Sequence, residues 1–241
     1  MKGTIHGLGL GPGNPDLMSV RADRLVRNAA NIAYFRKAGR KGHARAIVEG
    51  MFPSTARELP MEYPVTTEIP LSDPRYNEVL SQFYAECMDH LEALVKGGED
   101  VVVLCEGDPF FYGSFMHVYE RLKDKIPVQV VPAITGMSAA WTASGAPITW
   151  GDDILSTVMG TLDEQTLTKA IGDADALVIM KIGRNLPKVR RALDAAGKAD
   201  RAVLIEYASM EGETVRPLSK CSEEKLPYFS IIVVHGQGRR P

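Results

Sequence analysis

The spacing of apolar residues along the chain changes repeatedly between the period of a strand and that of a helix. Residues Val101–Cys105 form a continuous apolar run, which is typical of a strand buried on both faces of a parallel sheet. Upstream of it, apolar residues at helical spacing predict a helix over Pro74–Lys96. Asp73 suits the N-cap of this helix, and Gly97 suits its end. Its predicted buried face consists of Tyr76, Leu80, Phe83, Tyr84, Cys87, Met88, Leu91, Leu94 and Val95.

The alternation of strand and helix continues on both sides of this region and predicts an α/β protein. A break near Pro132–Gly136 separates two consecutive α/β units, and we expect a first domain at residues 1–132 and a second at 133–241. Ligands of such folds bind beyond the carboxyl ends of strands, so the loops that follow strands are the first places to look for chemistry. The other predicted strands are Thr4–Leu10, Asn31–Phe35, Val128–Val131, Ile154–Val158, Ala176–Lys181, Ala202–Glu206 and Phe229–Val234, and the other predicted helices include Asp16–Ala30, Ser138–Ala143, Glu164–Ile171 and Leu186–Ala196.

The composition agrees with this picture and removes several classes of protein. The 241 residues are 45% hydrophobic and 24% charged, as in soluble globular chains. Lys and Arg number 28 against 30 Asp and Glu, and this net charge of −2 disfavours a general nucleic-acid-binding protein. The apolar runs are too short to span a bilayer, and no signal peptide is visible. The three cysteines form no CxxC pair, so we expect a cytoplasmic protein.

A cluster of glycines over residues 7–15, the glycine loop, follows the first predicted strand. Glycine lets the backbone adopt positive φ and approach a ligand closely. The spacing does not match the dinucleotide fingerprint GxGxxG, because Pro12 fills the last position counted from Gly7 and Asn14 fills it counted from Gly9. The segment also lacks the Gly-Lys-Ser/Thr of a P-loop. It is either a ligand-binding loop of another kind or a structural turn.

A second candidate loop, Glu106–Pro109, comes directly after the buried strand. Asp108 is able to accept hydrogen bonds from a ligand or to cap the next turn, and Gly107 permits close approach. Gly-Asp-Pro alone is a common turn. Its position at a strand end, like that of the glycine loop, favours a binding role.

A basic segment, residues 36–45, follows the second predicted strand. It concentrates cationic side chains and one histidine within ten residues of a slightly acidic chain. One interpretation is a solvated surface loop. The other is a site for a phosphate or polycarboxylate ligand, whose oxygens match the arginine fork. The cationic residues of the basic segment are Arg36, Lys37, Arg40, Lys41 and Arg45.

No hydrolytic or metal-binding motif accompanies these loops. The five histidines are scattered, and neither HExxH nor Gly-x-Ser-x-Gly occurs. The sequence therefore gives no reason to expect a bound metal ion.

Three strand-end motifs together carry a family resemblance. They are the glycine loop read as Gly9-x-Gly11-Pro12-Gly13-Asn14-Pro15, then Gly107-Asp108-Pro109 with Tyr112, and then residues 132–138. This combination resembles the tetrapyrrole methylases, and the similarity covers essentially the whole chain. The resemblance implies a two-domain α/β fold with S-adenosylmethionine in the cleft between the domains. Segments 33–37, 180–185 and 205–210 further resemble the branch of the family that methylates precorrin-2 at C20.

The resemblance implies a role for individual residues. The residues implied to line the S-adenosylmethionine pocket or lie beside it are Pro12, Gly107, Asp108, Tyr112, Thr135, Gly136, Met180, Ile182, Tyr207 and Ala208. The acetate and propionate arms of a tetrapyrrole would contact the five cations of the basic segment, with Arg21 and Arg184 as secondary candidates. Glu106 and Glu206 are candidates for a general base.

Several alternatives stay open on the sequence alone. The tetrapyrrole could be metal-free precorrin-2 or its cobalt-containing counterpart, and methylation could fall on another tetrapyrrole position, on RNA or on a protein. A non-catalytic module that senses S-adenosylmethionine or a tetrapyrrole is a third class. An NADP oxidoreductase is disfavoured by the broken glycine pattern. Relatives suggest a homodimer, and no nucleic-acid or membrane partner is expected.

Overall fold

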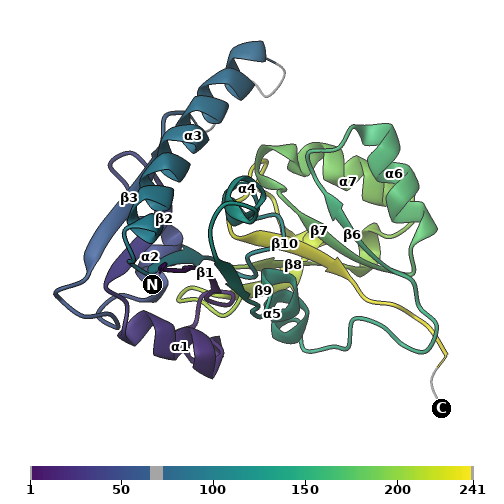
Figure 1. Cartoon of the computed structure of the whole chain (residues 1–241). Coiled ribbons are helices and arrows are strands. Elements are labelled where there is room, and N and C mark those ends of the chain that lie inside the picture. The colour runs from purple at the N-terminus through teal and green to yellow at the C-terminus, as the bar shows by residue number, and fades with distance from the viewer. Residues whose placement is uncertain (1, 66–72, 240–241) are drawn as a thin grey trace. The chain divides into compact units, whose positions relative to one another are not determined.

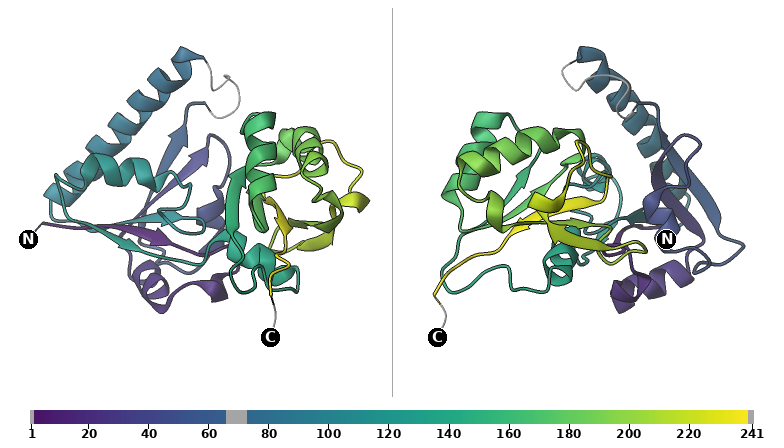
Figure 2. Two further views of the ribbon diagram at one scale, coloured as in Figure 1. Left: turned by 90° about the vertical axis from the view of Figure 1, so that its right-hand side faces the viewer. Right: turned by 180° about the vertical axis from the view of Figure 1, so that it is seen from behind.

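A computed structural model describes residues 2–65 and 73–239 of the chain (Figure 1). The backbone divides into two compact units, Met1–Thr135 and Gly136–Pro241. Each unit is built around one five-stranded sheet with helices on both faces, so the α/β class predicted from the sequence is confirmed. Figure 2 shows the same ribbon, with both sheets, from two further sides.

The sheet of the first unit is entirely parallel, with the strand order β3-β2-β4-β1-β5. Parallel pairing places the carboxyl ends of all five strands at one edge, which we call the carboxyl edge of the first unit. Val101–Cys105 is the central strand β4 and is buried along its whole length, as its continuous apolar run predicts. The other strands are β1 Ile5–Gly9, β2 Asn31–Lys37, β3 Arg57–Tyr63 and β5 Val128–Val131.

The α-helices among the described residues of the first unit cover both faces of this sheet. Helices α3 (Pro74–Lys96) and α4 (Phe115–Leu122) pack on one face, and α1 (Val20–Arg27) and α2 (His43–Ile47) pack on the other. Helix α3 has the bounds that its periodicity predicts. Asp73 caps its first turn by accepting a hydrogen bond from the Arg75 backbone at 3.0 Å.

The sheet of the second unit is mixed, with the strand order β6-β7-β10-β8-β9. Its strands are β6 Leu155–Met159, β7 Ala176–Met180, β8 Ala202–Glu206, β9 Thr214–Pro217 and β10 Ser230–Val234. Strand β10 runs antiparallel to both β7 and β8, so these two strands point the same way and end at the same edge. Helices α6 (Glu164–Asp173) and α7 (Leu186–Ala195) lie side by side on one face (Figure 1), and α5 (Gly136–Ala143) covers the other.

Among the α-helices and strands of the described residues, the sequence pattern misses α2, β3 and β9. Strands β3 and β9 are edge strands that contain proline and charged residues, which weaken the pattern of a strand. The predicted helix Asp16–Ala30 is wrong at both ends. A 3₁₀ helix occupies Pro15–Leu17, and α1 begins only at Val20 and ends at Arg27. Ser19 acts as the N-cap of α1 and accepts a hydrogen bond from the Ala22 backbone at 3.1 Å.

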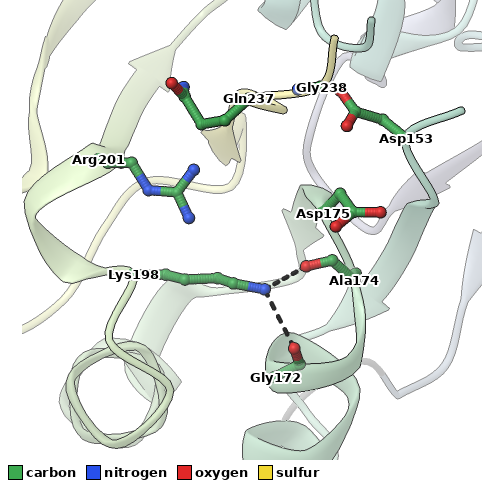
Figure 3. Close-up of a pocket in the computed structure, with 8 residues that line it drawn as sticks. All are labelled: Asp153, Gly172, Ala174, Asp175, Lys198, Arg201, Gln237 and Gly238. Carbon is green, nitrogen blue, oxygen red and sulfur yellow. Dashed lines mark hydrogen bonds between the residues drawn. The ribbon is translucent and has the colours of Figure 1, made fainter. Parts of the chain in front are cut away.

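The side chain of Lys198 closes the C-terminal end of α6 (Figure 3). Its Nζ donates to the carbonyl oxygens of Ile171 at 2.5 Å, Gly172 at 3.3 Å and Ala174. The last carbonyls of a helix have no partner within the helix, so an external donor is needed where they are buried. Burial also lowers the pKa of the Lys198 ammonium, a sign that its desolvation opposes the gain from these bonds.

We expect Lys198→Met to lower the free energy of unfolding by about 2 kcal/mol, because the carbonyls at the end of α6 lose their donor. For a chain of this size that loss corresponds to a fall in Tm of roughly 4–8 °C, measured by circular dichroism. The matched control is Lys169→Met in α6, whose exposed side chain pairs with Asp173 at 2.5 Å. The control is expected to change stability by less than about 0.5 kcal/mol. Equal Tm values for wild type and Lys198→Met would contradict the capping role.

Candidate functional site

The loops after β1 and β4 are tied together at the carboxyl edge of the first unit. The backbone N–H of Gly107 donates to the carbonyl oxygen of Gly11 at 2.8 Å, in an isolated antiparallel bridge. A Cβ at Gly9 would lie 2.6 Å from the Ala133 Cβ and 2.9 Å from the Gly107 oxygen. These approaches are closer than any side chain tolerates, so glycine is required where the ends of β1, β4 and β5 meet.

Both carboxylate oxygens of Asp108 are engaged by backbone donors. Oδ1 accepts from the Phe110 N–H at 2.9 Å, and Oδ2 accepts from the Ala133 N–H at 3.0 Å. The second bond joins the loop after β4 to the segment after β5, which are two of the three motifs singled out in the sequence. Asp108 therefore fixes the shape of the carboxyl edge.

The residues with a strained backbone lie in the loops that follow strands. In residues 2–65 and 73–239, the non-glycine residues with positive φ are Tyr112 (φ 54°), Lys181 (53°), Tyr207 (54°) and Ser209 (61°). A left-handed conformation costs a side-chain-bearing residue roughly 1–2 kcal/mol. Tyr112 lies in the loop after β4, Lys181 directly follows β7, and the other two follow β8. Strain of this kind is concentrated at functional loops in many proteins.

In the second unit, the predicted ligand residues lie at the edge where β7 and β8 end. Met180 is the last residue of β7, and Tyr207 directly follows β8 with 36% of its surface exposed. Gly136 begins α5, and a Cβ there would lie 3.7 Å from Cδ1 of Ile231 on β10. Ile182 is only 1% exposed and belongs to the hydrophobic core, so its side chain supports the loop.

The basic segment spans three elements: the end of β2, a turn, and α2. Arg36 and Lys37 lie on β2, which extends two residues beyond the predicted Phe35. Arg36 pairs across the sheet with Glu62, with Nη2 and Oε1 2.6 Å apart. Arg40 is exposed and has no ion pair within the part of the chain that the structure describes.

Arg45 is turned inward. Its Nε and Nη2 donate to the two carboxylate oxygens of Glu58 at 2.7 and 3.0 Å, and its guanidinium lies 4.4 Å from the Phe52 ring centroid. A bidentate pair of this geometry is a strong anchor. Lys41 and Arg45 both pair with Glu49. Glu49, Glu58 and Glu62 balance part of this positive charge. The exposed Arg40, which has no ion pair among the described residues, is open to an external anion.

The two candidate carboxylates differ in their surroundings. Glu206 is 9% exposed and is held by Arg216 at 3.0 Å and by the Thr214 hydroxyl at 3.2 Å. Glu106 retains partial exposure, and the backbone N–H of Ala44 in α2 stabilises its ionised form. Burial raises the pKa of Glu106 to about 7, and the Ala44 N–H only partly offsets this effect. Glu206 is a partner in an ion pair, whereas Glu106 is a desolvated acid.

The two secondary arginine candidates lie in different units. Arg21 donates from Nη2 to the Gln129 side chain at 2.7 Å, which joins α1 to β5. Arg184 is exposed in the 3₁₀ helix Gly183–Asn185 that follows β7.

A pocket of about 420 Å³ lies at the opposite edge of the second sheet (Figure 3). It borders the starts of β6, β7 and β8, and the charged groups that line it serve the fold. Asp153 accepts from the Trp150 backbone, Asp175 from the Ile154 backbone, and Arg201 donates to the His235 carbonyl. This pocket is separate from the strand ends that carry the candidate ligand residues.

The described residues contain neither a metal-ligand cluster nor a membrane-spanning helix. No group of three or more His, Cys, Asp or Glu side chains in that part of the chain could hold a metal ion. No helix among the described residues is long and apolar enough to cross a membrane.

Glycine-bearing and strained loops at strand ends define a class of α/β protein that binds its ligands at those loops. The chain belongs to the tetrapyrrole (corrin/porphyrin) methylase family, whose model matches residues 4–221. This confirms the family suggested by the strand-end motifs.

Named relatives show which enzymes of the family this chain resembles. The chain is 45% identical over 239 residues to a precorrin-2 C(20)-methyltransferase of Sinorhizobium sp, covering 99% of this chain and 98% of the relative. It is 27% identical to the cobalt-precorrin-2 C(20)-methyltransferase of Salmonella typhimurium, with 98% of both chains covered. The structure matches the uroporphyrin-III C-methyltransferase of Thermus thermophilus complexed with S-adenyl homocysteine with a TM-score of 0.68, at 21% identity and 97% coverage of each chain.

Proposed function

We propose that this chain transfers a methyl group from S-adenosylmethionine to C20 of precorrin-2, which gives precorrin-3A and S-adenosylhomocysteine. The observation that carries the proposal is the 45% identity to a precorrin-2 C(20)-methyltransferase over nearly the full length of both proteins. The lower identity to the cobalt-precorrin-2 enzyme favours the metal-free substrate over its cobalt-containing counterpart.

The strand-end loops suit a cofactor of this kind. S-adenosylmethionine supplies an electrophilic methyl group on a sulfonium. Pro12, Gly107 and Asp108 lie where the glycine loop meets the loop after β4, and small residues there leave the backbone open to a ligand. The residues that complete the proposed set are Tyr112, Thr135, Gly136, Met180, Ile182, Tyr207 and Ala208.

Positioning is the main task of the protein in this reaction. The reduced tetrapyrrole is an electron-rich, enamine-like nucleophile that needs no covalent intermediate with the enzyme. Holding two reactants in line is worth up to roughly 7–11 kcal/mol of the barrier. The bridge between Gly11 and Gly107 and the two hydrogen bonds of Asp108 supply rigidity for that purpose.

The basic segment is the proposed site for the carboxylate arms of the tetrapyrrole. Arg36, Lys37, Arg40 and Lys41 would contact the arms, with Arg21 and Arg184 as secondary candidates. Arg45 would act by holding α2 against Glu58, because its guanidinium forms a bidentate pair there and is less exposed than the side chains of Arg36 and Lys41. Exposed ion pairs contribute only about 0–1 kcal/mol each, so several must act together.

Neutralising Arg36 and Lys37 together, as Arg36→Gln/Lys37→Gln, is expected to weaken tetrapyrrole binding about tenfold. The loss of two charges near an anionic ligand accounts for about 1.4 kcal/mol. The dissociation constant for S-adenosylhomocysteine should change less than twofold. Both constants are measured by titration calorimetry, and equal losses for the two ligands would refute the assignment of the basic segment.

The experiment that tests the function is turnover with S-adenosylmethionine labelled with ¹³C at the methyl group. Metal-free and cobalt-containing precorrin-2 are supplied separately, and NMR of the product identifies the methylated carbon. Label at C20 with the metal-free substrate supports the proposal. Label at another carbon indicates a different tetrapyrrole methylase, and binding without incorporation indicates a sensing module.

We also propose a cytoplasmic homodimer. Cys87, Cys105 and Cys221 are free thiols, and burial raises the pKa of Cys87 to about 11, a state that suits a reducing compartment. Light scattering on the purified protein tests the dimer, which a monomer mass at micromolar concentration would exclude.

A further inference from the structure

Glu106 lies where three candidate segments meet. It directly follows the central strand β4 and precedes Gly107. The backbone N–H of Gly107 is hydrogen-bonded to Gly11 of the glycine loop. Successive side chains of a strand point to opposite faces of the sheet, so Glu106 shares the face of Leu104, two residues earlier. Leu104 belongs to the hydrophobic core under α1 and α2. The hydrogen bond from Ala44 of α2 agrees with that direction. Glu106 is thus placed between the proposed cofactor loops and the basic segment.

The carboxylate of Glu106 still has lone pairs that can accept a hydrogen bond, whereas the carboxylates of its acidic neighbours are engaged. An ionised carboxylate offers about four lone-pair positions, and the Ala44 N–H takes one of them. In residues 2–65 and 73–239, Glu106 forms no ion pair. By contrast, the carboxylates nearby each have identified partners. These are Glu49 with Lys41 and Arg45, Glu58 with Arg45 and Tyr34, Glu62 with Arg36, and Asp108 with two backbone donors.

We propose that Glu106 accepts the proton that leaves the tetrapyrrole after methyl transfer, an inference that rests on the proposed function. Its position beside both ligand loops, its partial exposure and its unused lone pairs carry the assignment. Glu206, the other candidate carboxylate, is engaged by Arg216 and Thr214.

The step balances without any further reagent. An electron pair of the tetrapyrrole forms the new bond from C20 to the methyl carbon, and the carbon–sulfur bond breaks with its pair kept by sulfur. The tetrapyrrole then carries one positive charge more than before. A proton leaves it, the bonding pair returns to the conjugated system, and the Glu106 carboxylate takes the proton. Water removes that proton before the next turnover.

Burial raises the pKa of Glu106 to about 7, which suits a group that must both take and release a proton near neutral pH. Burial lowers the pKa of His43 on α2, which makes its ring a weaker proton acceptor than an exposed histidine. Arg45 on α2 and Arg36 on β2 are held by Glu58 and Glu62.

A purely structural role is the competing explanation. Glu106 would then serve only to hold α2 through the Ala44 N–H, because Gly42 at the N-cap of α2 supplies no side-chain bond. Glu106→Gln separates the two roles. The amide keeps an oxygen acceptor for Ala44 but takes no proton near neutral pH.

The experiment compares wild type with Glu106→Gln in turnover of precorrin-2 between pH 5.5 and 9. Wild-type kcat is expected to rise with an apparent pKa near 7. The variant is expected to lose about 10²–10⁴-fold in kcat, as for other general bases, and to lose that pH dependence. The dissociation constant for S-adenosylhomocysteine should change less than twofold. Substrate deuterated at C20 should react more slowly than protiated substrate in the variant.

A second readout is the stability of the unliganded protein. A carboxyl whose pKa is raised on folding stabilises the fold below its unfolded pKa, and that contribution is lost as pH rises through the folded value. The Tm of wild type should therefore fall relative to that of Glu106→Gln between pH 5 and 8. The control Glu120→Gln removes an exposed carboxylate on α4 that pairs with Lys123. It should keep the wild-type activity profile.

The outcomes are distinct. Wild-type kcat and an unchanged pH profile in Glu106→Gln would overturn the assignment of Glu106 while leaving the proposed function intact. Equal losses of kcat and of S-adenosylhomocysteine affinity would show a structural role. A wild-type protein that does not methylate precorrin-2 would overturn the proposed function and this inference together.

Discussion

Replacing Gly9 with valine is expected to abolish detectable S-adenosylmethionine binding. A Cβ at this position would lie 2.6 Å from the Ala133 Cβ, 2.9 Å from the Gly107 oxygen and 2.9 Å from Cδ of Pro109. Two of these neighbours are held in place, since Gly107 is bonded to Gly11 and the Ala133 N–H to Asp108. The ends of β1, β4 and β5 must therefore move apart. We expect at least a 100-fold loss of affinity, about 2.7 kcal/mol, and a destabilisation of about 1–3 kcal/mol from overpacking.

The matched control for Gly9→Val is Gly172→Ala in α6. No atom lies within 4 Å of a Cβ built at Gly172, so alanine fits there. Alanine in a helix is more favourable than glycine by about 0.5–1 kcal/mol. This control should keep wild-type affinity with an equal or higher Tm. Calorimetric titration and thermal unfolding of both variants give the comparison, and unchanged affinity in Gly9→Val would remove the glycine loop from the proposed cofactor site.

Asp108→Ala is expected to weaken S-adenosylmethionine binding roughly 10–100-fold. The substitution leaves the N–H groups of Phe110 and Ala133 without their acceptor, and an unsatisfied backbone donor costs about 1–3 kcal/mol. Because the Ala133 bond joins the ends of β4 and β5, its loss loosens the carboxyl edge of the first unit. The expected fall in Tm is about 5–10 °C.

A second aspartate offers a control for Asp108. Asp163 also accepts a backbone hydrogen bond, from Thr166 at 2.9 Å at the start of α6, far along the chain from the candidate loops. Asp163→Ala should lose about 1 kcal/mol of stability, as for other N-caps, and should leave cofactor affinity unchanged. If both aspartate variants lost affinity equally, the effect would reflect general stability and the role assigned to Asp108 would fail.

The helices and strands that could be predicted are those whose own residues carry the caps and the apolar pattern that their packing requires. Helix α3 has its N-cap at Asp73, its end at Gly97 and a regular apolar face, and its bounds match the prediction. Strand β4 is apolar throughout because both of its faces are covered. Edge strand β3 lacks such a signal, since it gains its place by pairing with β2 along seven residues. Pairing partners distant in sequence leave no local trace in an edge strand.

The features of the candidate site also divide into those that the sequence predicts and those that it does not. Glycine at position 9 was open to prediction, because glycine is the residue that permits a close approach. The left-handed backbone at Lys181 was not, since lysine has no preference for that conformation. Charge counting found the basic segment but not the separate role of Arg45, whose acceptor Glu58 lies on the strand that the pattern missed. The roles of the individual ligand residues remain predictions that the variants above test.

The left-handed tyrosines carry a consequence for engineering. A library selected for heat resistance alone would favour glycine at positions 112 and 207, because glycine relieves the backbone there at no steric cost. The winners of that selection would lack two aromatic rings beside the strand ends. Selection for durability and selection for turnover would thus pull these two positions in opposite directions.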